Sequence, residues 1–231
     1  MKFLAIIPAR GGSKGIKNKN IINFDNKPLI YWTILAAKQC KLIDRVVVST
    51  DSKEIRNISV KFGALVPFLR PKNISRDKSN TLDAIKYTIE KFAKDENYSA
   101  DYIITLQPTS PLRNKTNIEE AIEKILKDKK ADSLVSCVSV PHNFLPESLM
   151  KLQGKYLKKF SKKSNSLRRQ DKKKLLARNG AAIYITKSKN INKYILGGKI
   201  LPYFMEYKNS IDIDTEEDLE IALLFKKFLK I

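Results

Sequence analysis

The chain has 231 residues, of which 42% are hydrophobic, enough to bury a substantial core within one globular domain. No apolar stretch approaches the roughly 20 residues of a membrane-spanning helix. Residues 3–7 are too short for a signal-peptide core, so we expect a cytoplasmic protein with no membrane partner. The net charge of +21 favours anionic ligands, but the lysines are scattered and no nucleic-acid-binding motif accompanies them. We therefore expect no specific nucleic-acid partner.

Apolar, β-branched runs alternate with amphipathic segments, which predicts alternating strands and helices. In chain order, strands are expected at 3–7, 45–51, 64–69, 102–106, 133–140, 180–185 and 201–205. Helices are expected at 28–40, 52–62, 81–94, 117–127 and 215–230. This alternation predicts an α/β fold with a mostly parallel sheet. Right-handed crossovers then bring the loops that follow the strands to one edge of that sheet.

The alternation breaks over residues 141–176, which contain the lone His142 and a dense basic stretch at 158–174. Apolar residues such as Phe144, Leu152 and Phe160 recur there. The segment is either a flexible surface loop or an arm that packs on another subunit. We favour the arm, because the apolar residues need a surface to pack against. Residues 1–140 and 177–231 are then one α/β domain, and 141–176 is an excursion from it.

A glycine-rich loop, Arg10-Gly11-Gly12-Ser13-Lys14-Gly15, follows the first strand directly. Glycines let the backbone approach a ligand, and free N–H groups together with lysines can hold phosphate oxygens. The glycine spacing matches neither the P-loop pattern nor the dinucleotide fingerprint, which argues against a P-loop kinase and a nicotinamide enzyme. The alternative is a glycine turn with solvated lysines.

Two carboxylates, Asp212 and Asp214, alternate with Ile211 and Ile213 near the end of the chain. This period of two places both acids on one side of the chain and both isoleucines on the other. Carboxylates at a strand end, close to bound phosphates, suit Mg²⁺. The alternative is a turn and capping pair, because acids also favour the start of the helix that follows.

Two further clusters carry polar groups. The loop Gln107–Arg113 follows the central strand, and its two prolines hold amide, hydroxyl and guanidinium groups in place. It either contacts a base or sugar or is a turn before a helix. Arg168-Arg169-Gln170 and Arg178-Asn179-Gly180 supply arginines, which pair with carboxylates and phosphates. In so basic a chain, these arginines are equally well interpreted as exposed side chains that bind no ligand.

Together these motifs resemble those of the acylneuraminate (CMP-sialic acid) cytidylyltransferases over essentially the whole chain. The resemblance rests on residues 7–20, on Leu-Gln-Pro-Thr-Ser-Pro-Leu-Arg at 106–113 and on Ser-Ile-Asp-Ile-Asp at 210–214. Residues 140–152 and 168–185 are further similar to the branch that activates legionaminic acid. The chain departs from the common pattern at Lys17-Asn18 and at the extra alanine in Ala181-Ala182.

The resemblance implies a Rossmann-like nucleotidyltransferase fold, a homodimer built by the excursion, and transfer of CMP from CTP to a nonulosonic acid with release of pyrophosphate. It implies CTP-binding residues Arg10, Gly11, Gly12, Ser13, Lys14, Lys19, Asn20, Arg70 and Thr81. It implies sugar-binding residues Gln107, Ser110, Arg113, Arg169, Arg178 and Asn179, and Mg²⁺ ligands Asp212 and Asp214. The expected catalytic residues are Arg10, Lys14, Lys19 and Asp214, the last also a candidate proton acceptor.

Two other functions remain open from the sequence. A related sugar nucleotidyltransferase, such as one acting on 3-deoxy-manno-octulosonate, would share the same motifs. A non-catalytic basic binding protein would retain the fold without turnover, although the intact pair of acids argues against it.

Overall fold

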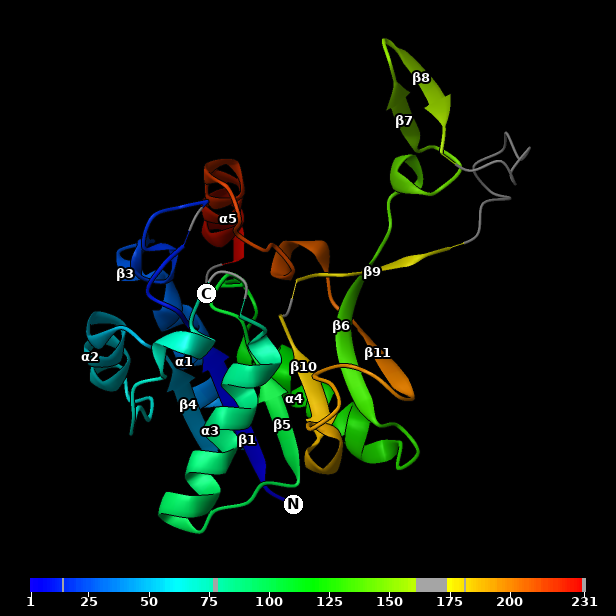
Figure 1. Ribbon diagram of the computed structural model, residues 1–231. Coiled ribbons are helices and arrows are strands. Elements are labelled where there is room, and N and C mark those ends of the chain that lie inside the picture. Colours follow the sequence, from blue (N-terminus) through cyan, green and yellow to red (C-terminus); the bar gives the residue numbers. More distant parts are fainter. Residues whose placement is uncertain (14, 77–78, 161–173, 181, 230–231) are drawn as a thin grey trace.

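A mixed sheet forms the centre of the computed structural model, which describes residues 1–13, 15–76, 79–160, 174–180 and 182–229. In this part of the chain seven strands share one sheet, in the order β11-β6-β10-β5-β1-β4, with β9 paired to β6 (Figure 1). Its strands are β1 (Phe3–Pro8), β4 (Arg45–Ser49), β5 (Tyr102–Thr105), β6 (Ser133–Ser139), β9 (Leu176–Arg178), β10 (Tyr184–Lys187) and β11 (Ile200–Phe204). Two hairpins lie outside it: β2 (Asn23–Phe24) with β3 (Lys27–Pro28), and β7 (Met150–Gln153) with β8 (Tyr156–Lys159).

Five strands of the sheet, β4, β1, β5, β6 and β11, run in the same direction, which confirms the predicted mostly parallel α/β sheet. β10 is antiparallel to both neighbours, and its first residue, Tyr184, pairs with Thr105 at the end of β5. The residues just before β10 therefore reach the edge at which the parallel strands end. That edge carries the candidate site.

The helices cover both faces of the sheet, as the alternation of strands and helices predicted. They are α1 (Leu29–Gln39), α2 (Lys53–Lys61), α3 (Thr81–Glu96), α4 (Lys115–Lys127) and α5 (Glu216–Leu229). Phe3, Ala5 and Ile7 of β1 pack in one apolar cluster with residues of α1 and α4. Leu4 and Ile6 point to the opposite face and pack in a second cluster with residues of α3. Within the described ranges, no helix is both long and apolar enough to cross a membrane.

Side-chain caps fix the starts of the helices that lead into or away from the site. Ser52 accepts a hydrogen bond from the Ile55 amide at the start of α2. Asn80 accepts one from the Leu82 amide at the start of α3. Before α5, the Thr215 hydroxyl accepts from the Asp218 amide and the Asp218 carboxylate accepts from the Thr215 amide, which forms a capping box. These caps satisfy N–H groups that the helix itself leaves unpaired.

Some predicted elements differ from the structure. The strand expected at 64–69 is only an isolated bridge between Leu65 and Val47, because Pro67 has no N–H with which to continue a ladder. α4 begins at Lys115 rather than at residue 117, because Asn114 and Asn117 form a reciprocal capping box. The strand expected at 180–185 lies at Tyr184–Lys187, since the Ala182 carbonyl and the Ile183 amide bond to the side chains of Arg113 and Ser136 instead.

The chain leaves the sheet after β6 and returns to it at β9, which pairs with the end of β6. Between them, the β7–β8 hairpin projects away from the rest of the molecule (Figure 1). Leu152 and Leu157 face each other across the hairpin and are 73% and 63% exposed. The hairpin therefore presents an apolar face that no described residue covers.

Candidate active site

A cavity of about 660 Å³ opens at the edge where β1 and β5 end. This volume lies within the range of about 300–1,000 Å³ typical of small-molecule sites. Nine of the residues predicted from the sequence line it: Arg10, Ser13, Lys19, Asn20, Arg70, Thr81, Gln107, Asp212 and Asp214. Segments nearly 200 positions apart in the chain thus contribute to one cavity.

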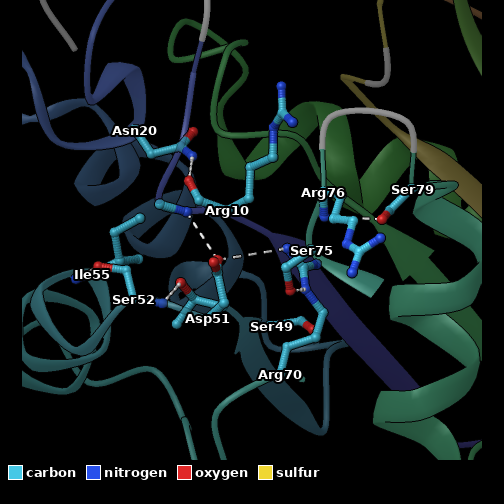
Figure 2. Close-up of polar contacts among 12 residues, drawn as sticks. Arg10, Asn20, Ser49, Asp51, Ser52, Ile55, Arg70, Ser75, Arg76 and Ser79 are labelled. Atoms are coloured by element: carbon cyan, nitrogen blue, oxygen red, sulfur yellow. Dashed lines mark hydrogen bonds and ion pairs between the residues drawn. The ribbon is translucent and has the colours of Figure 1, made fainter. Parts of the chain in front are cut away.

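The N-terminal loop is held by hydrogen bonds to its own residues and to the loop after β4 (Figure 2). The Asn20 amide donates to the carbonyl of Arg10 at 2.9 Å, and the Ser13 hydroxyl accepts from the Lys19 amide at 3.2 Å. The Gly11 amide donates to Asp51 at 2.9 Å. That N–H is thus already paired, and neither Gly11 nor Gly12 is among the residues that line the cavity.

Arg70 links this loop to the next wall of the cavity. Its Nε donates to the Ser75 hydroxyl at 2.9 Å, and its Nη2 lies 4.0 Å from Asp51 (Figure 2). Burial lowers the pKa of Arg70, the charge of Asp51 raises it again, and that of Arg10 lowers it. Ser75 also donates to the carbonyl of Pro71 at 2.8 Å, so Arg70 fixes the turn that leads towards α3.

The acidic motif lies against the same loop. Lys19 Nζ is 2.7 Å from Asp214 Oδ1 and donates to the Ile213 carbonyl at 2.8 Å. A Cβ added to Gly15 would lie 2.7 Å from the Asp214 carbonyl oxygen, so the two backbones approach as closely as glycine permits. The amino-terminal loop and the late acidic pair therefore meet directly, as the sequence predicted.

Asp212 and Asp214 have different environments. Asp214 is largely exposed, with 72% of its side chain open to solvent. Asp212 is mostly buried, and burial raises the pKa of its carboxyl, while a hydrogen bond from Thr109 opposes that shift. Asp212 Oδ1 is buried and has no hydrogen-bond partner among the described residues. An oxygen of this kind is suited to a cation, because a buried carboxylate otherwise costs desolvation energy.

The segment before β10 packs against Asp212. Gly180 has a φ of +63° and lines the cavity. Asn179 is 6% exposed; it donates to the Ser210 hydroxyl at 2.8 Å and accepts from the Ser136 hydroxyl at 2.7 Å. Asn179 therefore ties β6 to the start of the acidic motif and is not among the cavity-lining residues.

Two residues expected to face a sugar, Ser110 and Arg113, are buried behind the cavity wall. Arg113 is 1% exposed, and its Nη1 donates to the carbonyls of Ala182 at 3.1 Å and Gln107 at 3.4 Å. Its Nε and Nη2, like the Ser110 hydroxyl, have no hydrogen-bond partner within the described ranges. Burial lowers the pKa of Arg113 to about 9. The side chain joins the Gln107 loop to the segment before β10.

The remaining predicted residues lie elsewhere. Arg178 is exposed at the end of β9, and its guanidinium hydrogen-bonds the Tyr184 hydroxyl. That hydroxyl donates to the Gly180 carbonyl at 2.8 Å, so Tyr184, which lines the cavity, supports its wall. Lys14 and Arg169 lie outside the described residues.

Asp51 and Thr109 lie in loops that the sequence placed at this edge but were given no role of their own, and Tyr184 was not expected at the site. Asp51 ends a predicted strand, and its polar position at a strand end was the available signal. The Thr109 carbonyl accepts from the Ile213 amide at 2.8 Å, and its side chain contacts Asp212. Tyr184 opens an antiparallel strand, and no local pattern in the sequence indicates that direction.

Across the described residues, no group of three or more His, Cys, Asp or Glu side chains could hold a metal ion by itself. Asp212 and Asp214 could hold a divalent cation that takes its other ligands from substrate phosphates and water. Arg10 and Lys19 line the same cavity and carry the opposite charge. The cavity can therefore bind a polyphosphate between cationic side chains and two carboxylates.

A family profile described as cytidylyltransferase matches residues 4–230. The chain belongs to the cytidylyltransferase family. Membership makes it a nucleotidyltransferase, which confirms the class of enzyme expected from the three motifs.

Among relatives of this cytidylyltransferase, the pseudaminic acid cytidylyltransferase of Campylobacter jejuni is 33% identical over 228 residues, covering 98% of this chain and 97% of that protein. The CMP-N,N'-diacetyllegionaminic acid synthase of Legionella pneumophila is 34% identical over 94% of this chain and 93% of its own length. The N-acylneuraminate cytidylyltransferase of Escherichia coli is 32% identical over 98% of this chain, which spans only 52% of that relative. These matches confirm the resemblance to nonulosonic acid cytidylyltransferases.

A solved structure of CMP:2-keto-3-deoxy-manno-octonic acid synthetase complexed with CTP has the same fold. It aligns over 99% of this chain and 100% of that one, with a TM-score of 0.73 and 18% sequence identity. The match supports the Rossmann-like nucleotidyltransferase architecture.

Proposed function

We propose that this cytidylyltransferase activates a nonulosonic acid, of the sialic, legionaminic and pseudaminic class, by transferring CMP from CTP and releasing pyrophosphate. The observation that carries the proposal is the contact between Lys19 and Asp214 within one cavity. It brings cationic and acidic groups into one cavity, where a triphosphate could contact the cationic side chains and a metal ion the carboxylates. The relatives named for these acids support the substrate class.

In the proposed reaction the anomeric hydroxyl of the acid attacks the α-phosphorus of CTP, and the bond to the pyrophosphate oxygen breaks. The hydroxyl proton passes to Asp214, the candidate proton acceptor. Arg10 and Lys19 bind the phosphates and stabilise the charge that develops on the leaving pyrophosphate. Asp212 and Asp214 would hold Mg²⁺, which supplies charge neutralisation at phosphate oxygens. Positioning and electrostatics then account for most of the rate enhancement, as in other phosphoryl transfers.

We assign the acidic sugar to the part of the cavity lined by Gln107, Thr109 and Gly180, next to Asp212. Gln107 offers an amide that can both donate to and accept from sugar hydroxyls. Arg178, and Arg169 outside the described residues, are the proposed partners of the sugar's carboxylate and acyl groups. Arg113 and Ser110 would support this region from behind the wall rather than touch the sugar.

We further propose that the enzyme is a cytoplasmic homodimer. The exposed apolar face of the β7–β8 hairpin supports pairing with a second copy, because such faces rarely remain open to water. The free cysteines, Cys40 and Cys137, are both buried, which suits a reducing compartment.

The decisive experiment is a pyrophosphate-release assay with CTP and, in turn, sialic, legionaminic, pseudaminic and 3-deoxy-manno-octulosonic acids. We expect release with at least one of the first three acids and CMP-sugar formation in equal amount. Preference for the octulosonic acid would identify the related sugar nucleotidyltransferase instead. Absence of release with all four acids would support a binding protein without turnover.

A further inference from the structure

Lys19 lies between the N-terminal loop and the acidic motif and contacts both a side chain and the backbone of that motif. Its ammonium group is 2.7 Å from Asp214 Oδ1 and 2.8 Å from the Ile213 carbonyl oxygen. Only 15% of the Lys19 side chain is exposed, whereas 72% of Asp214 is. The lysine is therefore the more buried partner of this ion pair.

The charge of Lys19 also reaches the second acid. Lys19 favours the ionised form of Asp212, whereas Asp214 and Asp218 disfavour it. The Asp212 carboxyl meets a neutral hydrogen-bond donor, the Thr109 side chain, and no hydrogen-bond partner of its Oδ1 is found in the described part of the chain. Lys19 thus supplies positive charge to both carboxylates of the motif.

A divalent cation on Asp214 would lie next to this ammonium group. Like charges a few ångströms apart repel strongly when they are partly shielded from water. The flexible four-carbon stem of lysine lets its ammonium change partners without a change in the backbone. Phosphate oxygens of a nucleotide in the same cavity offer Lys19 such a partner.

We propose that Lys19 is the resident counter-ion of the acidic pair, so that a divalent cation binds well only together with a nucleotide whose phosphates draw Lys19 away from Asp214. This inference rests on the proposed CTP site. It makes Lys19 a residue that couples the binding of metal to the binding of nucleotide. Two ligands that share such a residue typically change each other's affinity by about 5- to 150-fold.

The test measures Mn²⁺ binding to the free enzyme, without nucleotide, by calorimetry and by electron paramagnetic resonance. Lys19→Met removes the charge, and Lys19→Gln removes it while keeping hydrogen-bond donors. We expect both to bind Mn²⁺ at least about fivefold more tightly than wild type. Lys19→Arg keeps the charge and should bind like wild type.

Lys17→Met is the matched control, because Lys17 is an exposed lysine of the same loop and its removal changes the net charge equally. We expect its Mn²⁺ affinity to equal that of wild type. Adding Asp214→Asn to Lys19→Met should abolish the gain. Equal or weaker Mn²⁺ binding by folded Lys19→Met or Lys19→Gln, or an equal gain in Lys17→Met, would overturn the proposal.

The outcomes separate this inference from the proposed function. Tighter Mn²⁺ binding by the Lys19 variants, with no pyrophosphate release by wild type on any acid, would leave the counter-ion role standing and reject the substrate assignment. Normal transferase activity of wild type, without that tightening, would reject the counter-ion role alone.

Discussion

Gly180 and Asp212 fit together only because Gly180 has no side chain: a Cβ there would lie 2.6 Å from the Asp212 Cγ. Gly180→Ala must therefore displace the Asp212 carboxylate. We expect turnover to fall about 100-fold, the size of loss that a misplacement of about 1 Å can produce. The measurement is kcat for CMP-sugar formation, together with thermal unfolding.

Gly154→Ala is the matched control for the strain of a positive φ. Gly154 has a φ of +60°, close to the +63° of Gly180, but a Cβ there meets nothing within 4 Å. Both variants should lose about 1–2 kcal/mol of stability from backbone strain. Only Gly180→Ala should lose turnover, and equal turnover in the two would show that the contact with Asp212 has no catalytic consequence.

Asp212→Asn should separate activity from stability. Turnover should fall by orders of magnitude, since the variant loses a carboxylate that would hold Mg²⁺ at the phosphates. At pH 7, however, we expect the variant to be more stable than wild type, because burial raises the pKa of the Asp212 carboxyl and the ionised form is costly in the folded state. Chemical denaturation at several pH values measures the difference.

The way in which this stability difference changes with pH follows from the linkage between folding and proton binding. The folded protein binds the Asp212 proton more tightly than the unfolded chain does, so this residue's contribution to stability falls as pH rises from the usual aspartate pKa to the raised folded value. The advantage of Asp212→Asn should therefore disappear at acid pH. Asp214→Asn, at an exposed position, should lose turnover without a comparable gain in stability, and a stability gain independent of pH would contradict the argument.

Asn179→Leu tests whether this buried amide binds the sugar or supports the site. The variant removes the hydrogen bonds to Ser210 and Ser136, which should cost about 1–3 kcal/mol of stability. Because Asn179 does not line the cavity, we expect kcat to fall while KM for the acid stays within about twofold of wild type. A large rise in KM with unchanged stability would instead support the direct sugar contact that the family resemblance implies.

The β7–β8 hairpin supplies a test of the dimer. Leu152 and Leu157 are cross-strand partners on one exposed face, so Leu152→Glu with Leu157→Glu places two charges there. Light scattering after gel filtration should show a monomer where wild type is a dimer. Val60→Glu, on the exposed surface of α2, is the control and should not change the mass. A wild-type monomer would remove the proposed role of the hairpin.

Periodicity and glycine signals were enough to predict the five described helices and six strands of the central sheet in their order along the chain. The β-branched runs at 45–51 and 102–106 are buried strands in the structure. The direction of β10 was not predictable, because hydrophobic pattern records which face of a strand is buried and not which way the strand runs. Strands β7, β8 and β9 were missed. They lie in or next to an exposed excursion, where the sequence shows little alternation of apolar and polar residues.

The sequence placed the polar residues of the motifs at the correct edge of the sheet. It did not show which of them line the cavity and which lie behind its wall. Arg113 and Ser110 carry groups that suit a ligand, yet their side chains are buried behind the cavity wall. Sequence shows which side chains a loop contains, while the loop's path decides which of them turn inwards. Asp51 lies in a loop expected at this edge but was given no role of its own, because it acts on the site through the Gly11 amide.

The position of β10 has a consequence for synthesis of the protein. β10 separates β5 from β6, although it follows both in the chain, so β5 and β6 have no shared partner until Lys187 has been translated. At about 5–20 residues per second, the interval after β6 lasts roughly 2–10 s. During that time the nascent chain exposes strand edges that attract chaperones or other copies of itself. Slower elongation across the excursion would prolong this vulnerable interval.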